Sequence, residues 1–236
     1  MNHLVRSATH RGTDRRVAVP LEDRVMQPRP APHATAQPPL PEHGPLLVLC
    51  GPMGSGKTSV GQALARRWSV ALRDTDEDVE EQAGVTIADI FLAEGEEAFR
   101  QREHEAVEAA LAEHRGVLAL GGGAPLRRDT QEELAAYVAG GGVVVFLDVS
   151  IEYAAPRVGL DDSRPLLMGN PRQRWIDIMR ERREIYESVS TIRTLTDGMT
   201  AAEVAKEIER RLRVAARERA EHAGHAKHGP HSGERH

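Results

Sequence analysis

One segment restricts the possible folds of this chain more than any other. Residues 51–58 (GPMGSGKT) match the pattern G-x-x-x-x-G-K-[ST] in full, after the apolar run 46–50 and before a stretch with apolar residues at helical spacing. Glycines in this pattern let backbone N–H groups turn inward around phosphate oxygens, and the start of the helix adds positive charge. The segment therefore predicts a buried strand, a phosphate-binding loop and a helix that together bind a nucleoside triphosphate.

The lysine of this loop is notable because lysine is rare in the chain. Of the 31 Lys and Arg residues, 28 are arginine and three are lysine, namely Lys57, Lys206 and Lys227. In loops of this pattern the lysine reaches the β- and γ-phosphates, and the hydroxyl that follows it, here Thr58, ligates Mg²⁺. A compact ammonium suits this position because a guanidinium fork would crowd the phosphates.

Short apolar runs alternate with helical patterns across the middle of the chain. Strands are predicted at 46–50, 70–72, 117–120, 143–147 and 191–195. Helices are predicted at 57–68, 77–83, 87–93, 96–114, 129–138, 151–158, 173–186 and 200–212, with Asp129 as the cap of the fifth. This alternation predicts a parallel sheet with helices on its faces and with ligands at the carboxyl ends of the strands.

The two ends of the chain differ from the middle in composition. All eight aromatic residues lie in the middle, whereas eight of the fourteen prolines lie between Pro20 and Pro45. We therefore expect one domain over residues 45–213, a disordered proline-rich extension over 1–44 and a disordered histidine-rich tail over 214–236. The tail histidines could hold a transition metal, but the Gly and Pro residues between them fix no coordination geometry.

Charge and cysteine content exclude several classes of protein. Residues 45–213 hold 21 Lys and Arg against 29 Asp and Glu, a balance of −8 that disfavours general nucleic-acid binding. The single cysteine, Cys50, excludes an internal disulfide, and its place at a strand end favours burial over a role as nucleophile. Apolar runs such as 143–147 are too short to cross a bilayer, so we expect a cytoplasmic protein that binds no membrane. The arginine-rich start also resembles an organelle transit peptide, an alternative that composition leaves open.

Two acidic positions could handle a metal ion and activate an acceptor. Asp148 ends the run VVVFLD like a Walker B strand, but Val149 follows where a water-activating Glu would be expected, so Asp148 is either a direct metal partner or a strand-end cap. Asp74 and Asp76 follow the second strand, and residues two apart on an extended segment point the same way. One could reach the water shell of the metal and the other an acceptor hydroxyl. The alternative is that both belong to an acidic helix start.

Arginines could supply the charge that an anionic acceptor requires. Arg100 has Glu103 one helical turn later, close enough to hold its guanidinium in place. Arg182 lies on the late helix, and two arginines that converge from different elements would clamp a carboxylate. Taken singly, each arginine could equally be a solvated surface residue.

Two glycine-containing segments complete the candidate site. Three consecutive glycines at 121–123 cost backbone entropy, which predicts a close approach to the main chain there. Arg164 lies in a polar segment between Gly159 and Gly169. This composition is typical of a mobile lid that carries a cation to the transferring phosphate.

In combination these segments resemble the shikimate kinases. The resemblance runs from about Leu46 to Leu212 and rests on GPMGSGKT, DTD at 74–76, GEEAFR ending at Arg100, LGGGA at 120–124 and RPLL at 164–167. It implies a three-layer α/β/α P-loop kinase fold of the nucleoside-monophosphate-kinase type, with a five-stranded parallel sheet and a mobile lid at about 159–170. It also implies that a monomer phosphorylates the 3-hydroxyl of shikimate with ATP to give 3-phosphoshikimate, a step of aromatic amino-acid biosynthesis.

The resemblance further implies a role for each matching residue. Shikimate would be bound by Asp76, Arg100, Gly122 and Arg182, and the catalytic residues would be Lys57, Asp76 and Arg164, with Asp76 as acceptor of the hydroxyl proton. ATP would be bound by Gly54, Ser55, Gly56, Lys57, Thr58, Ser59, Arg157 and Arg164, and Mg²⁺ by Thr58 and, through water, by Asp74. Family members often carry arginine or proline near the adenine where this chain has Met199 and Thr200.

Two other functions fit parts of the pattern. A different small-molecule kinase of the same fold, such as a gluconate kinase, would share the phosphate-binding loop, but a neutral polyol does not require both Arg100 and Arg182. A non-catalytic nucleotide-binding relative should have lost Lys57, Asp76 or one of these arginines, and all four are retained. The pattern therefore favours a kinase that acts on a small carboxylate.

Overall fold

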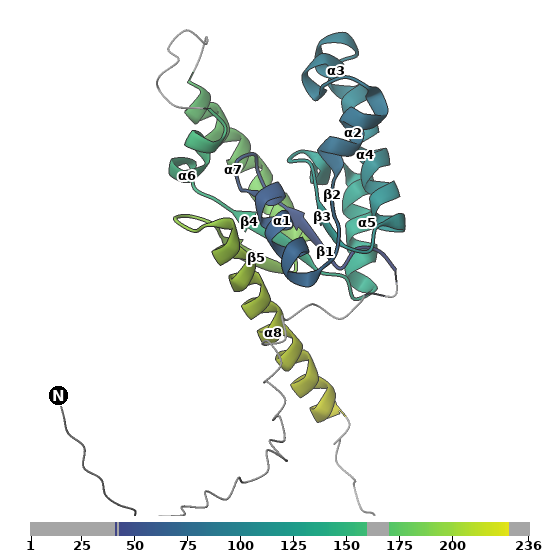
Figure 1. Ribbon diagram of the computed structural model, residues 1–236, viewed down its shortest axis with the longest axis vertical. Helices are drawn as coiled ribbons and strands as arrows, with labels where there is room; N and C mark the ends of the chain where they lie inside the picture. Colours follow the sequence, from purple (N-terminus) through teal and green to yellow (C-terminus); the bar gives the residue numbers. More distant parts are fainter. Residues whose placement is uncertain (1–40, 42, 160–169, 227–236) are drawn as a thin grey trace, which may run out of the picture. The chain divides into compact units, whose positions relative to one another are not determined.

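Figure 1 shows the computed structural model, in which residues 41, 43–159 and 170–226 are described. In this part the chain forms a five-stranded sheet in the order β2-β3-β1-β4-β5, and every pair of neighbouring strands is parallel. The strands are β1 (Leu47–Cys50), β2 (Leu72–Asp74), β3 (Val117–Ala119), β4 (Val144–Asp148) and β5 (Ile192–Leu195). The sheet confirms the predicted α/β fold.

Helices connect the strands and cover both faces of the sheet. They are α1 (Lys57–Trp68), α2 (Thr75–Ala83), α3 (Ile87–Ala93), α4 (Glu96–Glu113), α5 (Arg128–Ala139), α6 (Ile151–Arg157), α7 (Pro171–Val189) and α8 (Ala201–Ala226), with a 3₁₀ turn, η1 (Ala124–Leu126). Apolar residues of α1 and α8 pack on one face, and those of α4, α5 and α7 pack on the other. The result is the predicted three-layer arrangement.

The alternation of side chains along β1 divides the core into two layers. Leu47 and Leu49 pack toward α1 and α8, whereas Val48 and Cys50 pack toward α4, α5 and α7. All four side chains are buried because a central parallel strand is covered on both faces. The burial of Cys50 at the end of β1 confirms the predicted buried strand residue, and this burial raises the pKa of its thiol to about 12.

The helices α2, α3 and α4 form a smaller unit beside the β2 edge of the sheet (Figure 1). They enclose a separate apolar cluster made of Val79, Ile90, Phe99 and Ala106. Because α2 starts directly after β2, this unit lies at the carboxyl end of the strands, where ligands bind in open parallel sheets. The unit thus brings the charged side chains of α2 and α4 to the candidate site.

The predicted end of the last helix and the predicted cap of the fifth helix were wrong. The last helix, α8, continues to Ala226 instead of ending at Leu212, so no disordered tail begins at residue 214. The added segment is rich in Ala, Arg and Glu, which have high helix propensity. Asp129 does not cap α5, because Arg127 occupies the N-cap position and donates a hydrogen bond of 3.0 Å to Asp129 in the first turn.

Other predictions fall on residues that the structure does not describe. These residues include 1–40 of the extension, the tail beyond Ala226 and the segment 160–169, with Arg164 and most of the predicted lid. Among the helices of the described ranges, none is both long and apolar enough to cross a membrane.

Candidate active site

The loop between β1 and α1 has the backbone of a phosphate cradle. Gly51, Gly54 and Gly56 have φ angles of 144°, 84° and 90°, a region that favours glycine. A Cβ atom on Gly51 would lie 2.6 Å from the carbonyl oxygen of Leu147, so a side chain there would also clash. The hydroxyl of Ser55 is buried and has no hydrogen-bond partner among the described residues. These features fit the binding of a phosphate group, whose oxygens would supply that partner.

Lys57 starts α1 and folds back over this loop. Its Nζ atom donates hydrogen bonds to the carbonyl oxygens of Gly51, at 2.9 Å, and of Pro52, at 3.2 Å. Burial lowers the pKa of the ammonium, and the carboxylates of Asp76 and Asp74 oppose that shift. The cation therefore lies close to both the phosphate-binding loop and two acidic residues.

Thr58 and Asp74 lie together beside the loop, as the predicted metal site requires. Thr58 Oγ1 donates a hydrogen bond of 2.8 Å to Oδ2 of Asp74. Oδ1 of Asp74 accepts the backbone N–H of Asp76 at 3.1 Å, so Asp74 also caps α2, which begins at Thr75 instead of residue 77. Asp74 therefore belongs to an acidic helix start, as the alternative interpretation predicted, and it also contacts Thr58. Hydroxyl and carboxylate oxygens are ligands that Mg²⁺ prefers, so this pair fits that ion.

The glycine segment after β3 is approached closely by charged side chains of the protein itself. A Cβ atom on Gly121 would collide with the carboxylates of Asp76 and Glu103, and one on Gly123 would collide with the guanidinium of Arg100. The backbone N–H of Gly121 also donates a hydrogen bond of 2.8 Å to the Thr75 hydroxyl. The predicted close approach is therefore confirmed. Glycine is needed because three charged groups pack directly on this backbone.

Arg100 is held in place by the acidic residues of its own helix. Its Nη1 atom donates to Oε2 of Glu103 at 2.5 Å and its Nη2 atom donates to Oε1 of Glu96 at 3.3 Å. The guanidinium also lies 5.0 Å from the centre of the Phe99 ring. Glu103 is buried, and burial raises its pKa while Arg100 and, to a smaller extent, Arg182 lower it. The predicted pairing of Arg100 with Glu103 is confirmed.

On the opposite side of the site, α7 contributes Arg182 and Tyr186. The hydroxyl of Tyr186 donates a hydrogen bond of 2.6 Å to the carbonyl oxygen of Gly122. Its ring stacks on Phe146 of β4, with ring centres 5.3 Å apart. Burial raises the pKa of Tyr186 to about 12, and the charge and hydrogen bond of Arg182 oppose that shift. The contact between Tyr186 and Gly122 thus links α7 to the glycine segment.

These elements surround a cavity of about 310 Å³, which we call the acceptor pocket. Its lining includes the four residues predicted to bind the acceptor, Asp76, Arg100, Gly122 and Arg182, together with Lys57 and Glu103. The rest of the lining is mainly apolar and includes Ile87, Phe91, Phe99, Trp175, Ile178 and Met179. Two guanidiniums from separate helices therefore share one cavity with a carboxylate and with the lysine of the phosphate-binding loop.

Sequence reasoning missed Trp175 and Tyr186. Trp175 lines the acceptor pocket, and its indole Nε1 donates a hydrogen bond of 3.1 Å to the carbonyl oxygen of Met53 in the phosphate-binding loop. Trp175, Arg182 and Tyr186 follow one another at intervals of seven and four residues, which places them on one face of a helix. That spacing was the signal that could have identified them.

A second cavity, of about 350 Å³, lies on the α1 and α8 side of the loop, and we call it the nucleotide pocket. Its lining includes Ser59, Arg157, Met199 and Thr200, with Ser55, Gly56, Val60, Thr196, Ala201 and Val204. Arg157 Nη1 donates a hydrogen bond of 3.0 Å to the carbonyl oxygen of Gly54. Of the residues predicted to bind ATP, Ser55, Gly56, Ser59 and Arg157 line this cavity, next to Met199 and Thr200.

Both interpretations of Asp148 were wrong. Its carboxylate accepts two hydrogen bonds from Arg183, each at 2.9 Å, and two from Arg193, at 2.9 and 2.6 Å. Burial raises the pKa of Asp148, but the bonds from these arginines outweigh it and lower the pKa below its usual value. The carboxylate therefore joins β4 to α7 and β5 and is not free to bind a metal directly or to cap the strand. Its partners lie 35 and 45 residues away in sequence, so no local pattern revealed them.

A phosphate-binding loop next to a cation-lined cavity defines a P-loop phosphotransferase that acts on a small molecule. The family model described as shikimate kinase matches residues 53–213. Shikimate kinase of Streptomyces coelicolor is 53% identical over 162 residues, which cover 69% of this chain and 92% of the relative. That of Thermobifida fusca is 51% identical over 171 residues, which cover 72% and 96%. The chain belongs to the shikimate kinase family.

Comparison of structures agrees with this assignment. The shikimate kinase from Acinetobacter baumannii, solved in complex with shikimate, has a TM-score of 0.63 and 34% sequence identity, over 71% of this chain and 92% of that one. The shikimate kinase from Aquifex aeolicus has a TM-score of 0.57 and 32% identity, over 72% and 97%. In each case the matched part includes nearly the whole of the other chain.

Proposed function

We propose that this chain transfers the γ-phosphoryl group of ATP to the 3-hydroxyl of shikimate, giving ADP and 3-phosphoshikimate in the biosynthesis of aromatic amino acids. The observation that carries the proposal is the acceptor pocket, where Arg100 and Arg182 share a cavity with Asp76 and Lys57. We also propose that the chain acts as a monomer in the cytoplasm.

The two arginines bind the carboxylate of shikimate. Arg100 is oriented before binding, because Glu103 and Glu96 hold its guanidinium. Arg182 enters the pocket from a different helix, so the two cations approach the carboxylate from two directions. Gly122 lines the same pocket, and its lack of a side chain leaves room for the ring of the substrate.

Asp76 holds the 3-hydroxyl and accepts its proton. Burial and the neighbouring Asp74 raise the pKa of this carboxyl above its usual value, which makes it a stronger base than an exposed aspartate. As the hydroxyl oxygen forms its bond to the γ-phosphorus, the bond from that phosphorus to the ADP oxygen breaks. The hydroxyl proton passes to Asp76.

The phosphate-binding loop holds ATP on the other side of the reacting phosphorus. Backbone and side-chain groups of residues 54–59 bind the phosphates, with Lys57 at the β- and γ-phosphates. Thr58 and Asp74 would hold Mg²⁺, which would supply positive charge to the phosphate oxygens. Arg157 and the Met199–Thr200 segment form the adenine side. Arg164, which lies outside the described residues, is the further cation that the family resemblance assigns to the transferred group.

A coupled assay of ADP release tests the proposal. Full-length protein is mixed with Mg-ATP and with either shikimate or gluconate. We expect ADP release that depends on shikimate, and no more than background release with gluconate. Turnover that requires gluconate would favour the alternative function as a gluconate kinase. Absence of turnover with shikimate would refute the proposed activity.

A further inference from the structure

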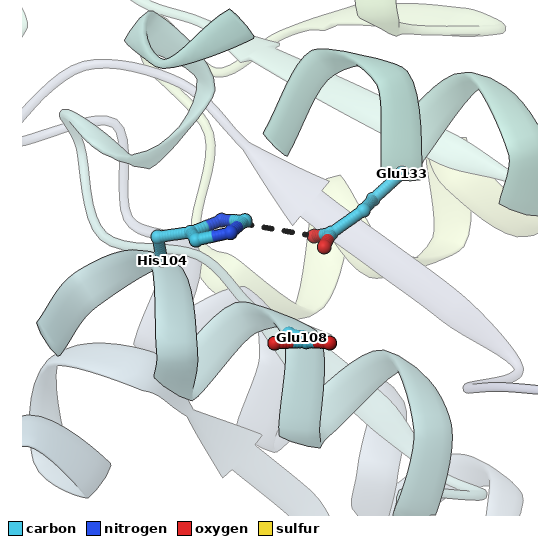
Figure 2. Close-up of side chains that lie close together, drawn as sticks. All are labelled: His104, Glu108 and Glu133. Atoms are coloured by element: carbon cyan, nitrogen blue, oxygen red, sulfur yellow. Dashed lines mark ion pairs between the residues drawn. The ribbon is translucent and has the colours of Figure 1, made fainter. Parts of the chain in front are cut away.

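A second group of metal-ligating side chains lies outside the acceptor pocket. His104 and Glu108 are on α4, one helical turn apart, and Glu133 projects toward them from α5 (Figure 2). One ligand atom from each side chain lies within 4.8 Å of the ligand atoms of the other two. The proposed reaction uses none of these three residues.

The imidazole of this group is fixed by neighbouring side chains. Nδ1 of His104 lies 3.1 Å from the hydroxyl oxygen of Thr130, which is fully buried in α5. The same nitrogen lies 3.9 Å from Oε2 of Glu133. Nδ1 is thus the nitrogen that faces Glu133, and its lone pair is available to a metal when Nε2 carries the proton.

Glu133 provides an independent indication of a cation. Its Oε2 atom is buried and accepts no hydrogen bond from the described residues. Burial raises the pKa of Glu133, His104 opposes the shift, and the carboxylates of Glu108 and Asp129 raise the pKa further. A buried carboxylate oxygen is unfavourable unless a donor or a cation satisfies it. A divalent cation would do so and would also relieve the repulsion between Glu108 and Glu133.

The set of ligands suits a transition metal better than Mg²⁺ because it includes an imidazole nitrogen. Zn²⁺ binds such nitrogen and carboxylate ligands at about 2.0–2.2 Å, so ligand atoms in a tetrahedral site lie about 3.4 Å apart. Rotation of the two glutamate side chains would close the observed separations of up to 4.8 Å. A cavity of about 450 Å³, lined in part by Glu108 and Glu133, adjoins the group and offers access to an ion.

We propose that His104, Glu108 and Glu133 form a binding site for a transition-metal dication such as Zn²⁺. The ion joins α4 to α5 through three protein ligands and leaves a fourth position for water. Because α4 also carries Arg100 and Glu103 of the acceptor pocket, the ion braces the helix that supports one side of that pocket.

The test compares full-length wild-type protein with the double variant Glu108→Gln/Glu133→Gln. Both proteins keep the histidines of the tail, so binding of Zn²⁺ there is common to both. Each is titrated with Zn²⁺ by calorimetry in the presence of excess Mg²⁺, and thermal unfolding is followed with and without Zn²⁺. The wild type should bind one more equivalent of Zn²⁺ than the variant, and only the wild type should gain thermal stability from that equivalent.

The matched control is Glu105→Gln/Glu132→Gln, which removes two exposed carboxylates from the same two helices. It should bind Zn²⁺ like the wild type. His104→Gln should weaken the site at least about tenfold, since loss of supporting partners alone has effects of about 10–100-fold. With Co²⁺ in place of Zn²⁺, it should also remove the part of the visible absorption that Glu108→Gln/Glu133→Gln removes. Equal Zn²⁺ stoichiometry and affinity in the wild type and the first double variant would overturn the proposal, as would an equal loss in the matched control.

Discussion

The acceptor pocket and the nucleotide pocket adjoin the same phosphate-binding loop but are built in different ways. The nucleotide pocket is formed largely by residues of the loop, the start of α1 and the start of α8, and its loop side holds Ser55 and Gly56, whose φ of 90° favours glycine. The acceptor pocket is formed by side chains of α2, α3, α4 and α7, and the charged groups of Asp76, Arg100 and Glu103 pack on the glycine segment after β3. One pocket thus depends on local backbone conformation, and the other depends on side chains that tertiary structure brings together.

Because of this difference, the two pockets can recognise different chemical groups. Backbone N–H groups bind phosphate in any nucleotide, because phosphate oxygens are common to all of them. The acceptor pocket selects by charge. Glu103 and Glu96 already pair with Arg100, whereas the ion pairs found within the described ranges include none with Arg182. Arg182 is therefore the cation whose charge a bound carboxylate would balance. Substitutions in the two pockets should accordingly affect the kinetic constants of different substrates.

The largest effect is expected for Asp76→Asn. The amide cannot accept the hydroxyl proton, so kcat should fall by about 10²–10⁴-fold, the usual contribution of a general base. The fold should stay intact, which circular dichroism and thermal unfolding would check. Glu77→Gln is the matched control, because Glu77 is exposed in the same helical turn, and it should keep normal turnover. Full activity of Asp76→Asn would remove the role assigned to Asp76.

Arg182→Ala tests the charge selection of the acceptor pocket. Loss of one charge-assisted contact of about 1.5–3 kcal/mol should raise KM for shikimate by about 10–150-fold, with little change in KM for ATP. Initial rates over a grid of both substrate concentrations would separate the two constants. Arg180→Ala, which removes an exposed arginine of the same helix, should change neither. An equal rise of both constants in Arg182→Ala would contradict the division between the pockets.

Asp148→Asn should affect stability more than substrate binding. The change leaves Arg183 and Arg193 without their shared carboxylate, and we expect the free energy of unfolding to fall by about 1–3 kcal/mol, because both guanidiniums remain partly in contact with water. Urea unfolding would measure this loss. Asp177→Asn, which breaks an exposed ion pair on α7, should change stability by less than about 1 kcal/mol. If Asp148→Asn lost no more free energy of unfolding than Asp177→Asn, the stabilising role of the bonds from Arg183 and Arg193 to Asp148 would be contradicted.

The pH dependence of the same variant gives a further check. The pKa of Asp148 lies below its usual value of 3.8 in the folded protein, so its ionised form stabilises the fold. That contribution is complete above about pH 3.8 and is lost as the pH falls through the lower folded pKa. Asp148→Asn should lack this part of the acid dependence of unfolding.

The smallest effect is expected for Tyr186→Phe. It removes the hydrogen bond to the carbonyl oxygen of Gly122 and the one with Arg182, and each such loss costs about 0.5–1.5 kcal/mol. Because Gly122 lines the acceptor pocket, KM for shikimate should rise a few-fold while KM for ATP stays constant. Tyr137→Phe is the control, since its hydroxyl bonds to the carbonyl of Pro45 outside both pockets, and it should lower stability without changing either KM. A rise in KM for ATP in Tyr186→Phe would contradict its link to the acceptor pocket alone.

The same division explains what the sequence could predict. The phosphate-binding loop, the parallel sheet and the pairing of Arg100 with Glu103 follow from short-range patterns, and the structure confirms them. The partners of Asp148 and the role of Trp175 depend on contacts between segments 35 to 122 residues apart, which no local pattern records. The end of α8 was missed because its last turns are held by helix propensity and not by an apolar stripe. Site residues that lie on different helices could be predicted only because the resemblance to a known family indicated their positions in the sequence.

The most direct test of the central claim compares shikimate with its carboxamide as acceptors for the full-length enzyme. The carboxamide keeps the ring and the 3-hydroxyl but lacks the charge that Arg182 is expected to bind. The account predicts that kcat/KM for shikimate exceeds that for the carboxamide by about tenfold or more, and that Arg182→Ala removes most of this preference. Equal kcat/KM for the two acceptors in the wild-type enzyme would contradict the claim that the acceptor pocket selects a carboxylate.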